Sequence, residues 1–356
     1  MAPDSSLCRH QLGEAQTSHQ RHLLLKATLP FCLGLTFFAT QIEARTEPIR
    51  DSWSEISASF HTHERSSMKN PGALNSLSPS SKFFNSSPAG ERWSNRSQIP
   101  IPNQPAIQRQ IRFYEGKGRS DFSGALERSW SYSTVMAQIL DSEGVPPELI
   151  AVVMVESCFK GRASHKGAVG YWQLLASTAR SMGLRVDRWV DERYDPVKST
   201  QAAAKYLRSL YDQFGCWTLA IAAYNSGDAP VMSAIKKHGV NDFWEISKRG
   251  SLPRITRAYV PKVLAAIRIM RNLDAHGFES PQQFPIYDYE SVSIKSPLQL
   301  EQVAKWINVP TSDLRDLNPS LRHDRLPPNG GVKLNLPSGA RDKFDVAYAR
   351  YTSGRN

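Results

Sequence analysis

Between about residues 105 and 275 the chain is a succession of apolar segments with helical spacing, each bounded by glycine or proline. In ALERSWSYSTVMAQILDSEG the apolar side chains form one broad helical stripe, which Gly144 ends. Pro146-Pro147 begins the segment PPELIAVVMVESCFK, and Asp195-Pro196 is typical of an N-cap followed by a first-turn proline. No part of this region alternates polar and apolar residues as a strand does. The sequence therefore predicts a mainly α domain over 105–277.

A smaller unit follows over residues 285–340. YESVSI and GVKLNLP have the composition of strands, whereas LQLEQVAKWIN and SDLRDLN have helical patterns. Asn318-Pro319 and the run PPNGG supply the turns between them. This order predicts a small β-α-α-β module, which is more typical of a binding function than of catalysis.

The first 104 residues have a different character. Ala27 to Thr40 is apolar and follows basic residues, but it is shorter than the ~20 residues that a membrane span needs. Residues 1–44 therefore predict a secretory signal, with a membrane anchor as the alternative. Residues 45–104 are polar and lack apolar periodicity, which predicts a disordered tether. Secretion would place the protein in the periplasm or cell envelope, and an anchor would associate it with the membrane.

The formal net charge of +11 favours an anionic partner. The basic residues are scattered, and there is no aromatic-interleaved basic run or zinc-finger spacing, so no nucleic-acid partner is expected. His61 and His63 lie in the predicted tether, where a solvated tail is the simpler interpretation. No cysteine sits in a CxxC or Cys/His cluster, and the sequence predicts no metal site and no cofactor.

Glu156 lies in an unusual place for an acidic residue. In a helix it shares a face with Leu149, Val152 and Val153. Apolar surroundings disfavour the charged carboxylate, and the helix dipole near the last turn acts in the same direction, so we expect a raised pKa. A carboxyl group that is protonated near neutral pH can donate a proton to a glycosidic oxygen. The alternative is a glutamate at a frayed helix end, half in solvent.

Two further segments fit a sugar site, although neither is specific alone. SHKGAVGYWQ holds two glycines three residues apart, where backbone can approach a ligand closely, and ends in Trp172-Gln173, which could stack on and hydrogen-bond to a sugar. Tyr224-Asn225 closes an apolar helix just before Gly227.

Four segments in order, ELIAVVMVESCF, GAVGYWQLLASTAR, AYNSG and ITRAYVPKVL, resemble the soluble lytic transglycosylase family, which shares the goose-type lysozyme fold. The resemblance covers roughly residues 105–275, and within the family it is strongest to the membrane-bound lytic murein transglycosylases of type D. The C-terminal unit resembles a LysM-like module through SDLRDLNPSL, with a poorer match after its first strand.

The resemblance implies a lysozyme-like helical catalytic domain that acts on peptidoglycan glycan strands. Such enzymes cleave the MurNAc–GlcNAc bond and form 1,6-anhydro-MurNAc ends. Glu156 then corresponds to the family's general acid/base, and Tyr259 to the tyrosine that faces it. The residues implied to line the sugar subsites are Ser164, Gln173, Tyr224 and Asn225. Two alternatives stay open: a hydrolysing muramidase on the same fold, and a peptidoglycan-binding protein with weak catalysis.

Two features depart from the family's pattern. Ile255 precedes Thr256 where the family usually has Glu, so a substrate-contacting or capping carboxylate is lost. Cys158 and Cys216 stand where other residues are common, and in a secreted protein they could form a disulfide. The alternative is two separate buried thiols that behave as small apolar groups.

Overall fold

The structure is a computed structural model that describes residues 99–280, 289–328 and 330–353. The predicted signal or anchor over 1–44 and the tether up to residue 98, including His61 and His63, lie outside the described residues. Ile99, near the end of the predicted tether, is buried against the helical core. Within the described ranges, no helix combines the length and the apolar character that crossing a membrane requires.

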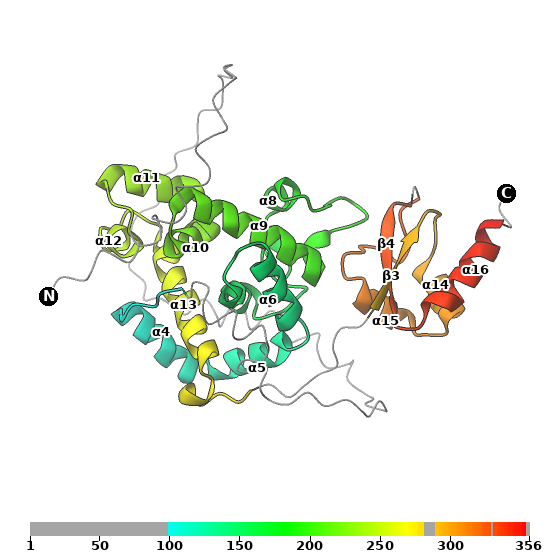
Figure 1. The fold of residues 1–356 in the computed structure, drawn as a ribbon, viewed down its shortest axis with the longest axis horizontal. Helices are drawn as coiled ribbons and strands as arrows, with labels where there is room; N and C mark the ends of the chain where they lie inside the picture. The colour runs from blue at the N-terminus through cyan, green and yellow to red at the C-terminus, as the bar shows by residue number, and fades with distance from the viewer. Residues whose placement is uncertain (1–98, 281–288, 329, 354–356) are drawn as a thin grey trace, which may run out of the picture. The chain divides into compact units, whose positions relative to one another are not determined.

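The region that ends near residue 280 consists almost wholly of helices, which confirms the predicted mainly α fold (Figure 1). The helices are α4 (Pro105–Glu115), α5 (Arg119–Ser129), α6 (Ser133–Ser142), α7 (Ala151–Ser157), α8 (Ala176–Ser181), α9 (Pro196–Phe214), α10 (Trp217–Ser226), α11 (Asp228–His238), α12 (Phe243–Lys248) and α13 (Arg254–Arg271). Three short 3-10 helices join them: η2 (Pro147–Ile150), η3 (Glu192–Tyr194) and η4 (Asp274–His276).

Helix α10 lies at the centre of this region. Its side chains from Leu219 to Ala223 are all fully buried, as expected of a helix that has no polar face. It packs against α9, α11 and α13, and its last turn carries Tyr224 and Asn225. The burial of α10 therefore fixes where this pair of polar residues emerges from the core.

Helix α9 begins as the sequence predicts. The Asp195 carboxylate accepts hydrogen bonds from the backbone N–H groups of Val197 (3.0 Å) and Lys198 (2.9 Å). These bonds satisfy two of the free donors at the helix start. Gly215 ends the helix in the left-handed conformation, with φ of 66°.

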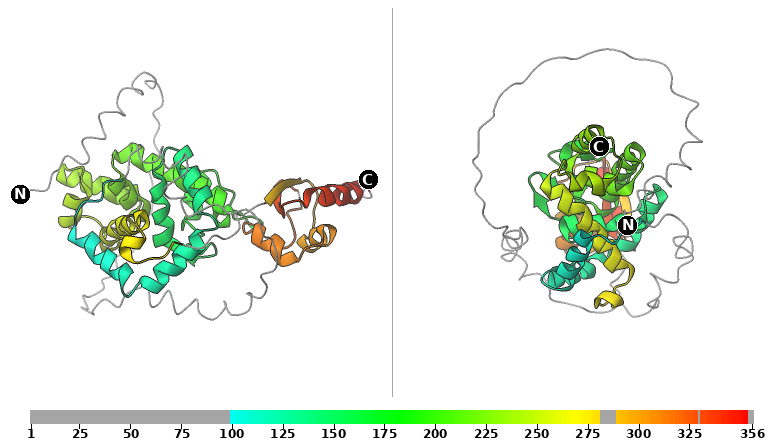
Figure 2. Two further views of the ribbon diagram at one scale, coloured as in Figure 1. Left: turned by 60° about the horizontal axis from the view of Figure 1, so that its bottom comes forward. Right: turned by 90° about the vertical axis from the view of Figure 1, so that its left-hand side faces the viewer.

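Helix α13 lies beside α4, as Figures 1 and 2 show. This helix begins at Arg254 and passes through Pro261. A proline inside a helix removes one backbone hydrogen bond. Val260, Val263 and Leu264 are fully buried around it, and their burial outweighs that loss.

The single helix predicted before Gly144 is in fact two helices. The chain leaves the helical conformation between α5 and α6, at residues 130–132. Here the hydroxyl of the buried Ser129 donates to the Leu126 carbonyl (2.7 Å). The turn places the ring of Tyr132 edge-on to the ring of Tyr171, with 5.4 Å between centroids.

A small hairpin also interrupts the helical region, where the sequence predicted no strand. Strands β1 (Ser164–His165) and β2 (Ala168–Val169) pair antiparallel, and Val169 forms a further bridge with Leu174. Two-residue strands are too short to produce an alternating pattern in the sequence. Gly167 and Gly170 both have positive φ and permit the tight path of the loop.

The C-terminal module, residues 289–353, has its own hydrophobic core. It contains the predicted β-α-α-β order as β3 (Tyr289–Ile294), α14 (Leu300–Ile307), α15 (Thr311–Leu317) and β4 (Val332–Pro337). The two strands are antiparallel, from the pair Tyr289–Pro337 to the pair Ile294–Val332. An additional helix that the sequence did not predict, α16 (Arg341–Ser353), covers this core with the buried side chain of Phe344.

Gly170 and Gly167 give a matched test of the loop's packing. A Cβ atom at Gly170 would lie 2.0 Å from the Arg193 carbonyl oxygen, whereas one at Gly167 would meet nothing within 4 Å. Both residues have positive φ, so Gly167→Ala should cost about 1 kcal/mol through backbone strain alone. Gly170→Ala should lower the free energy of unfolding by at least ~2 kcal/mol more, because the backbone of the loop must move. Chemical denaturation of both variants measures this, and equal losses would contradict the close approach.

Candidate active site

Glu156 lies in the last turn of α7, and the rest of this helix is buried. The hydroxyl of Tyr259, from α13, donates a hydrogen bond of 2.6 Å to the Glu156 carboxylate. Burial raises the pKa of Glu156 to about 7, and the hydrogen bond from Tyr259 lowers it by less. Both causes of this pKa shift are thus uncharged: burial and a phenol hydrogen bond. The half-buried Glu156 can therefore hold a proton near neutral pH, as the sequence predicted.

Helix α7 ends abruptly after Glu156. Cys158 and Phe159 both adopt left-handed backbone conformations, with φ of 49° and 57°. Such conformations cost free energy in residues other than glycine. Two hydrogen bonds hold this end in place: Arg128 donates to the Cys158 carbonyl (2.9 Å), and the Ser157 hydroxyl donates to the Tyr171 carbonyl (2.8 Å). The second bond ties the acidic residue's helix to the 163–174 loop.

The 163–174 loop carries two of the predicted site residues. Ser164 is exposed in β1. Gln173 has positive φ of 47°, and its side-chain amide donates to the carbonyls of Gly170 (2.8 Å) and Ala163 (3.1 Å). The amide N–H groups of Gln173 therefore stabilise the loop itself, which the sequence did not predict.

Tyr224 and Asn225 come from the end of α10. The Tyr224 hydroxyl donates to the Trp172 carbonyl (2.7 Å), and Asn225 accepts a hydrogen bond from the Thr256 hydroxyl (3.0 Å). Burial, and next the charge of Glu156, raise the pKa of Tyr224 well above its usual value. The same two causes, in the same order, raise the pKa of Tyr259. Both phenols therefore stay protonated beside Glu156.

The predicted residues lie at different distances along the bonds and chain segments that lead from Glu156. Tyr259 bonds to Glu156 directly, Tyr224 is linked through its charge interaction, and Asn225 is linked through Thr256, one turn before Tyr259. Gln173 follows Trp172, the residue that accepts from Tyr224. Ser164 joins only through the backbone of its hairpin.

The prediction that Trp172 could stack on a sugar is wrong. Its side chain is fully buried, and its indole N–H donates to the Thr200 hydroxyl on α9 (2.8 Å). A buried tryptophan with a satisfied N–H anchors its loop rather than facing a ligand.

The disulfide considered between Cys158 and Cys216 is also absent. The two cysteines are not bonded to each other: Cys216 is buried, with its Sγ 3.1 Å from the Thr218 hydroxyl, and Cys158 is partly buried. Burial raises the pKa of the Cys158 thiol, so it stays protonated. The alternative of two separate thiols is confirmed.

A second set of residues, which supports the 163–174 loop, was not predicted from the sequence. Arg193 donates from its guanidinium to the carbonyls of Gly167 (2.9 Å) and Leu174 (3.0 Å), and it forms a buried ion pair with Asp191 (2.8 Å). Residues of this kind could have been suspected only from the acidic and basic residues crowded in DERYDP.

In the described part of the chain, no group of three His, Cys, Asp or Glu side chains could hold a metal ion.

The raised pKa of Glu156 makes stability depend on pH. The folded protein binds the proton of Glu156 up to about pH 7, whereas the unfolded chain releases it near pH 4.5. The stability that this proton binding by Glu156 contributes is therefore complete below pH 4.5 and is lost as the pH rises through 7. Relative to Glu156→Gln, the wild-type free energy of unfolding should fall by about 3 kcal/mol over this window. Chemical denaturation of the wild type and Glu156→Gln at several pH values tests this. If the free energies of unfolding of the two proteins changed in parallel with pH, the prediction would be contradicted.

Removing the Tyr259 hydroxyl should raise the pKa of Glu156 above its value of about 7, because the hydrogen bond that favours the carboxylate is lost. NMR titration of the side-chain carboxyl of Glu156 in Tyr259→Phe measures the shift. Tyr224→Phe is the control, because the Tyr224 hydroxyl donates to a backbone carbonyl instead. A lower pKa in Tyr259→Phe would show that the bond does not act in this direction.

Two family models match parts of this chain. Residues 134–247 match the model of the transglycosylase SLT domain, and residues 288–353 match that of the lytic transglycosylase MltD, LysM-like domain. The membrane-bound lytic murein transglycosylase D of Escherichia coli (strain K12) is 31% identical over 271 residues, which cover 74% of this chain and 59% of that relative. The chain thus spans about three fifths of the length of this relative.

More distant relatives match a smaller part. The peptidoglycan transglycosylase gp16 of Escherichia phage T7 is 35% identical over 127 residues, which cover 33% of this chain and 9% of that protein. The crystal structure of the soluble lytic transglycosylase SLT70 from Escherichia coli is 20% identical, with a TM-score of 0.38, and covers 51% of this chain and 32% of that one. A score this low adds nothing to the assignment, which depends on the two domain matches. The chain therefore carries a transglycosylase SLT domain over residues 134–247 and a LysM-like domain of the lytic transglycosylase MltD type over residues 288–353.

Proposed function

We propose that the protein is a lytic transglycosylase that cleaves the MurNAc–GlcNAc bond of peptidoglycan, with Glu156 as its general acid/base. The observation that carries the proposal is a half-buried carboxyl group with a pKa of about 7, which is hydrogen-bonded by Tyr259 and has no charged partner among the described residues. The 31% identity to a lytic murein transglycosylase over most of the chain supports the choice of substrate.

The reaction needs only one protein carboxyl group. Protonated Glu156 donates its proton to the glycosidic oxygen as the bond to the anomeric carbon breaks, and the substrate's own N-acetyl group bonds to that carbon. The Glu156 carboxylate then accepts the proton of the sugar's 6-hydroxyl, whose oxygen displaces the N-acetyl group. The product is a 1,6-anhydro-MurNAc end, and Glu156 is protonated again. Glycosidases that use water normally need two carboxyl groups.

The neighbouring residues have supporting roles in this proposal. Tyr259 orients the Glu156 carboxyl group and stabilises its charged form between the two steps. The residues proposed to line the sugar subsites are Ser164, Gln173, Tyr224 and Asn225. Gln173 and Tyr224 also hold the 163–174 loop, so changes at these positions should affect sugar binding and loop geometry together.

The other parts of the chain fit the same substrate. The LysM-like domain supports binding to peptidoglycan glycan strands. The similarity to a membrane-bound enzyme suggests a location in the cell envelope, reached through the N-terminal signal or anchor.

Ile255 is 74% exposed at the start of α13, so the missing family carboxylate leaves an apolar side chain in solvent. Binding of the sugar at this point is then weaker, while proton transfer by Glu156 is unaffected.

Glu156→Gln should abolish cleavage while the protein stays folded, because the amide keeps the shape but cannot donate the proton. General acid catalysis contributes ~10²–10⁴-fold, so residual activity should be slight. Glu127→Gln, at an exposed position of α5, is the control and should retain wild-type activity. Mass spectrometry of digested sacculi reads the outcome. Reducing muramic ends would indicate a hydrolysing muramidase, and no soluble product from the wild type would indicate a wall-binding protein.

A further inference from the structure

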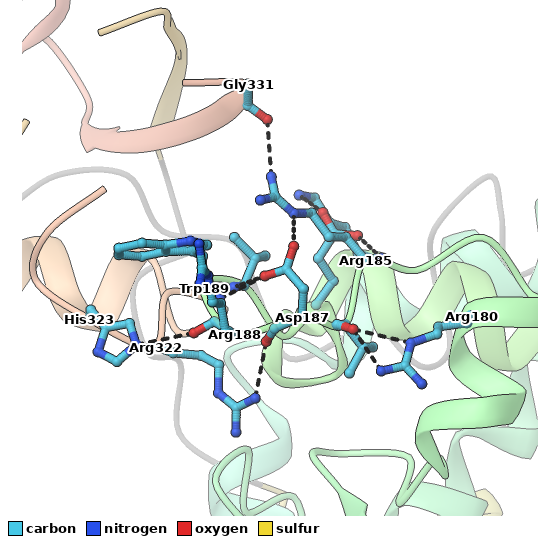
Figure 3. Close-up of polar contacts among 12 residues, drawn as sticks. Arg180, Arg185, Asp187, Arg188, Trp189, Arg322, His323 and Gly331 are labelled. Carbon is cyan, nitrogen blue, oxygen red and sulfur yellow. Dashed lines mark hydrogen bonds and ion pairs between the residues drawn. The ribbon is translucent and has the colours of Figure 1, made fainter. Parts of the chain in front are cut away.

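The segment from Arg185 to Arg193, here called the docking turn, is held rigidly by its own hydrogen bonds. The Asp187 carboxylate accepts from the backbone N–H groups of Trp189 (2.7 Å) and Val190 (2.8 Å) and pairs with Arg185 (2.6 Å). Arg180, on α8, donates twice to the Val186 carbonyl (2.8 and 3.1 Å) (Figure 3). The turn is therefore a fixed part of the helical region.

The outer side of this turn completes the C-terminal module, which belongs to the same compact unit as the helical region. Val190 is 3% exposed, yet it is buried in the core of the module and not in the core of the helical region. It bridges to Leu321 in antiparallel fashion. The backbone N–H of Asp191 donates to the Ser320 carbonyl (2.8 Å), and that of Arg322 donates to the Trp189 carbonyl (3.0 Å).

Polar contacts also join the docking turn to the module, as Figure 3 shows for Arg322 and His323. From the module, Arg322 donates to the Asp187 carbonyl (3.1 Å), and the His323 ring lies 3.1 Å from the Arg188 carbonyl oxygen. The rings of Trp189 and His323 meet edge-on with 5.5 Å between centroids. An apolar centre with a polar rim is the usual anatomy of a specific protein interface.

The inner side of the turn supports the active site. Asp191, whose backbone binds the module, forms a buried ion pair with Arg193, with side-chain exposures of 1% and 8%. The same Arg193 guanidinium donates to the carbonyls of Gly167 and Leu174. These carbonyls flank the part of the 163–174 loop that contacts Ser157 and Tyr224. A continuous chain of bonds therefore leads from the module to the neighbours of Glu156.

We propose that the docked C-terminal module holds the 163–174 loop in place through Asp191 and Arg193, which makes these two side chains positioning residues for the site. The module is then a structural part of the active site as well as a separate glycan-binding unit. Docking and loop order do not depend on the proposed function. Only the activity measurement in the test rests on it.

Three variants of the full chain separate the steps. Val190→Asp places a charge in the interface, and Arg193→Lys keeps the charge but loses the forked contacts to the loop. Val346→Asp is the matched control, because Val346 is 56% exposed on α16, away from the interface contacts. Should Val190→Asp fail to fold, Arg322→Ala replaces it, since the Arg322 side chain is not buried.

Hydrogen exchange gives the first readout. In the wild type and Val346→Asp, the amides of Asp191 and Arg322 should be protected; in Val190→Asp they should exchange about tenfold faster, together with the amides of Val169 and Gly170. Arg193→Lys should loosen only the loop amides. Unprotected interface amides in the wild type would overturn docking. An unchanged loop in Val190→Asp would overturn the positioning role.

Kinetics on glycan strands gives the second readout. Both Val190→Asp and Arg193→Lys should raise KM by about tenfold, because the loop no longer holds its geometry. The pKa of the basic limb of the pH profile should not move, because neither side chain bonds to Glu156. A fall in kcat with a shifted basic limb would place these residues in the proton-transfer step and contradict the proposal. Absence of activity in the wild type would count against the proposed function, while the exchange result would still decide docking.

Discussion

The arrangement around Glu156 depends on placing a carboxyl group among apolar side chains, with no charged partner in the described part of the chain. Burial disfavours the ionised form, and the hydrogen bond from Tyr259 partly offsets this effect. This balance holds only if three helices keep their positions. Helix α7 carries the acid, and α13, which packs directly against both α7 and α10, carries its hydrogen-bond donor. The fully buried alanines and branched residues of α10 and α13 are what make that packing close.

The same constraint explains the geometry next to the acid. Helix α7 must stop immediately after Glu156 so that the chain can turn toward the 163–174 loop, and two left-handed residues make that turn. Such strain persists where the surrounding structure holds it in place. Arg128 and Ser157 provide that support, from outside the helix and from its end. Strain at this point therefore reflects the precise placement of one carboxyl group.

Much of this could be predicted from the sequence. The apolar run of α10, the Asp195 cap and the position of Glu156 on an apolar face are local patterns, and each is present in the structure. The misses have a common physical cause. The break between α5 and α6, the hairpin and the burial of Trp172 are decided by contacts with distant segments, such as Tyr171 and Thr200. Arg193 was missed for the same reason, because its partners at Gly167 and Leu174 lie 26 and 19 residues away in the sequence.

The position of Val190 has a consequence for how this chain can be divided. In the sequence the module begins after residue 280, but its hydrophobic core includes a side chain contributed almost a hundred residues earlier. A segment cut out at the sequence boundary would expose the apolar surface that Val190 covers, around Leu321. The C-terminal module therefore cannot be moved to another protein without losing part of its hydrophobic core. A graft that preserves its core must carry the turn around Val190 with it, or replace that valine with an apolar residue from the new host.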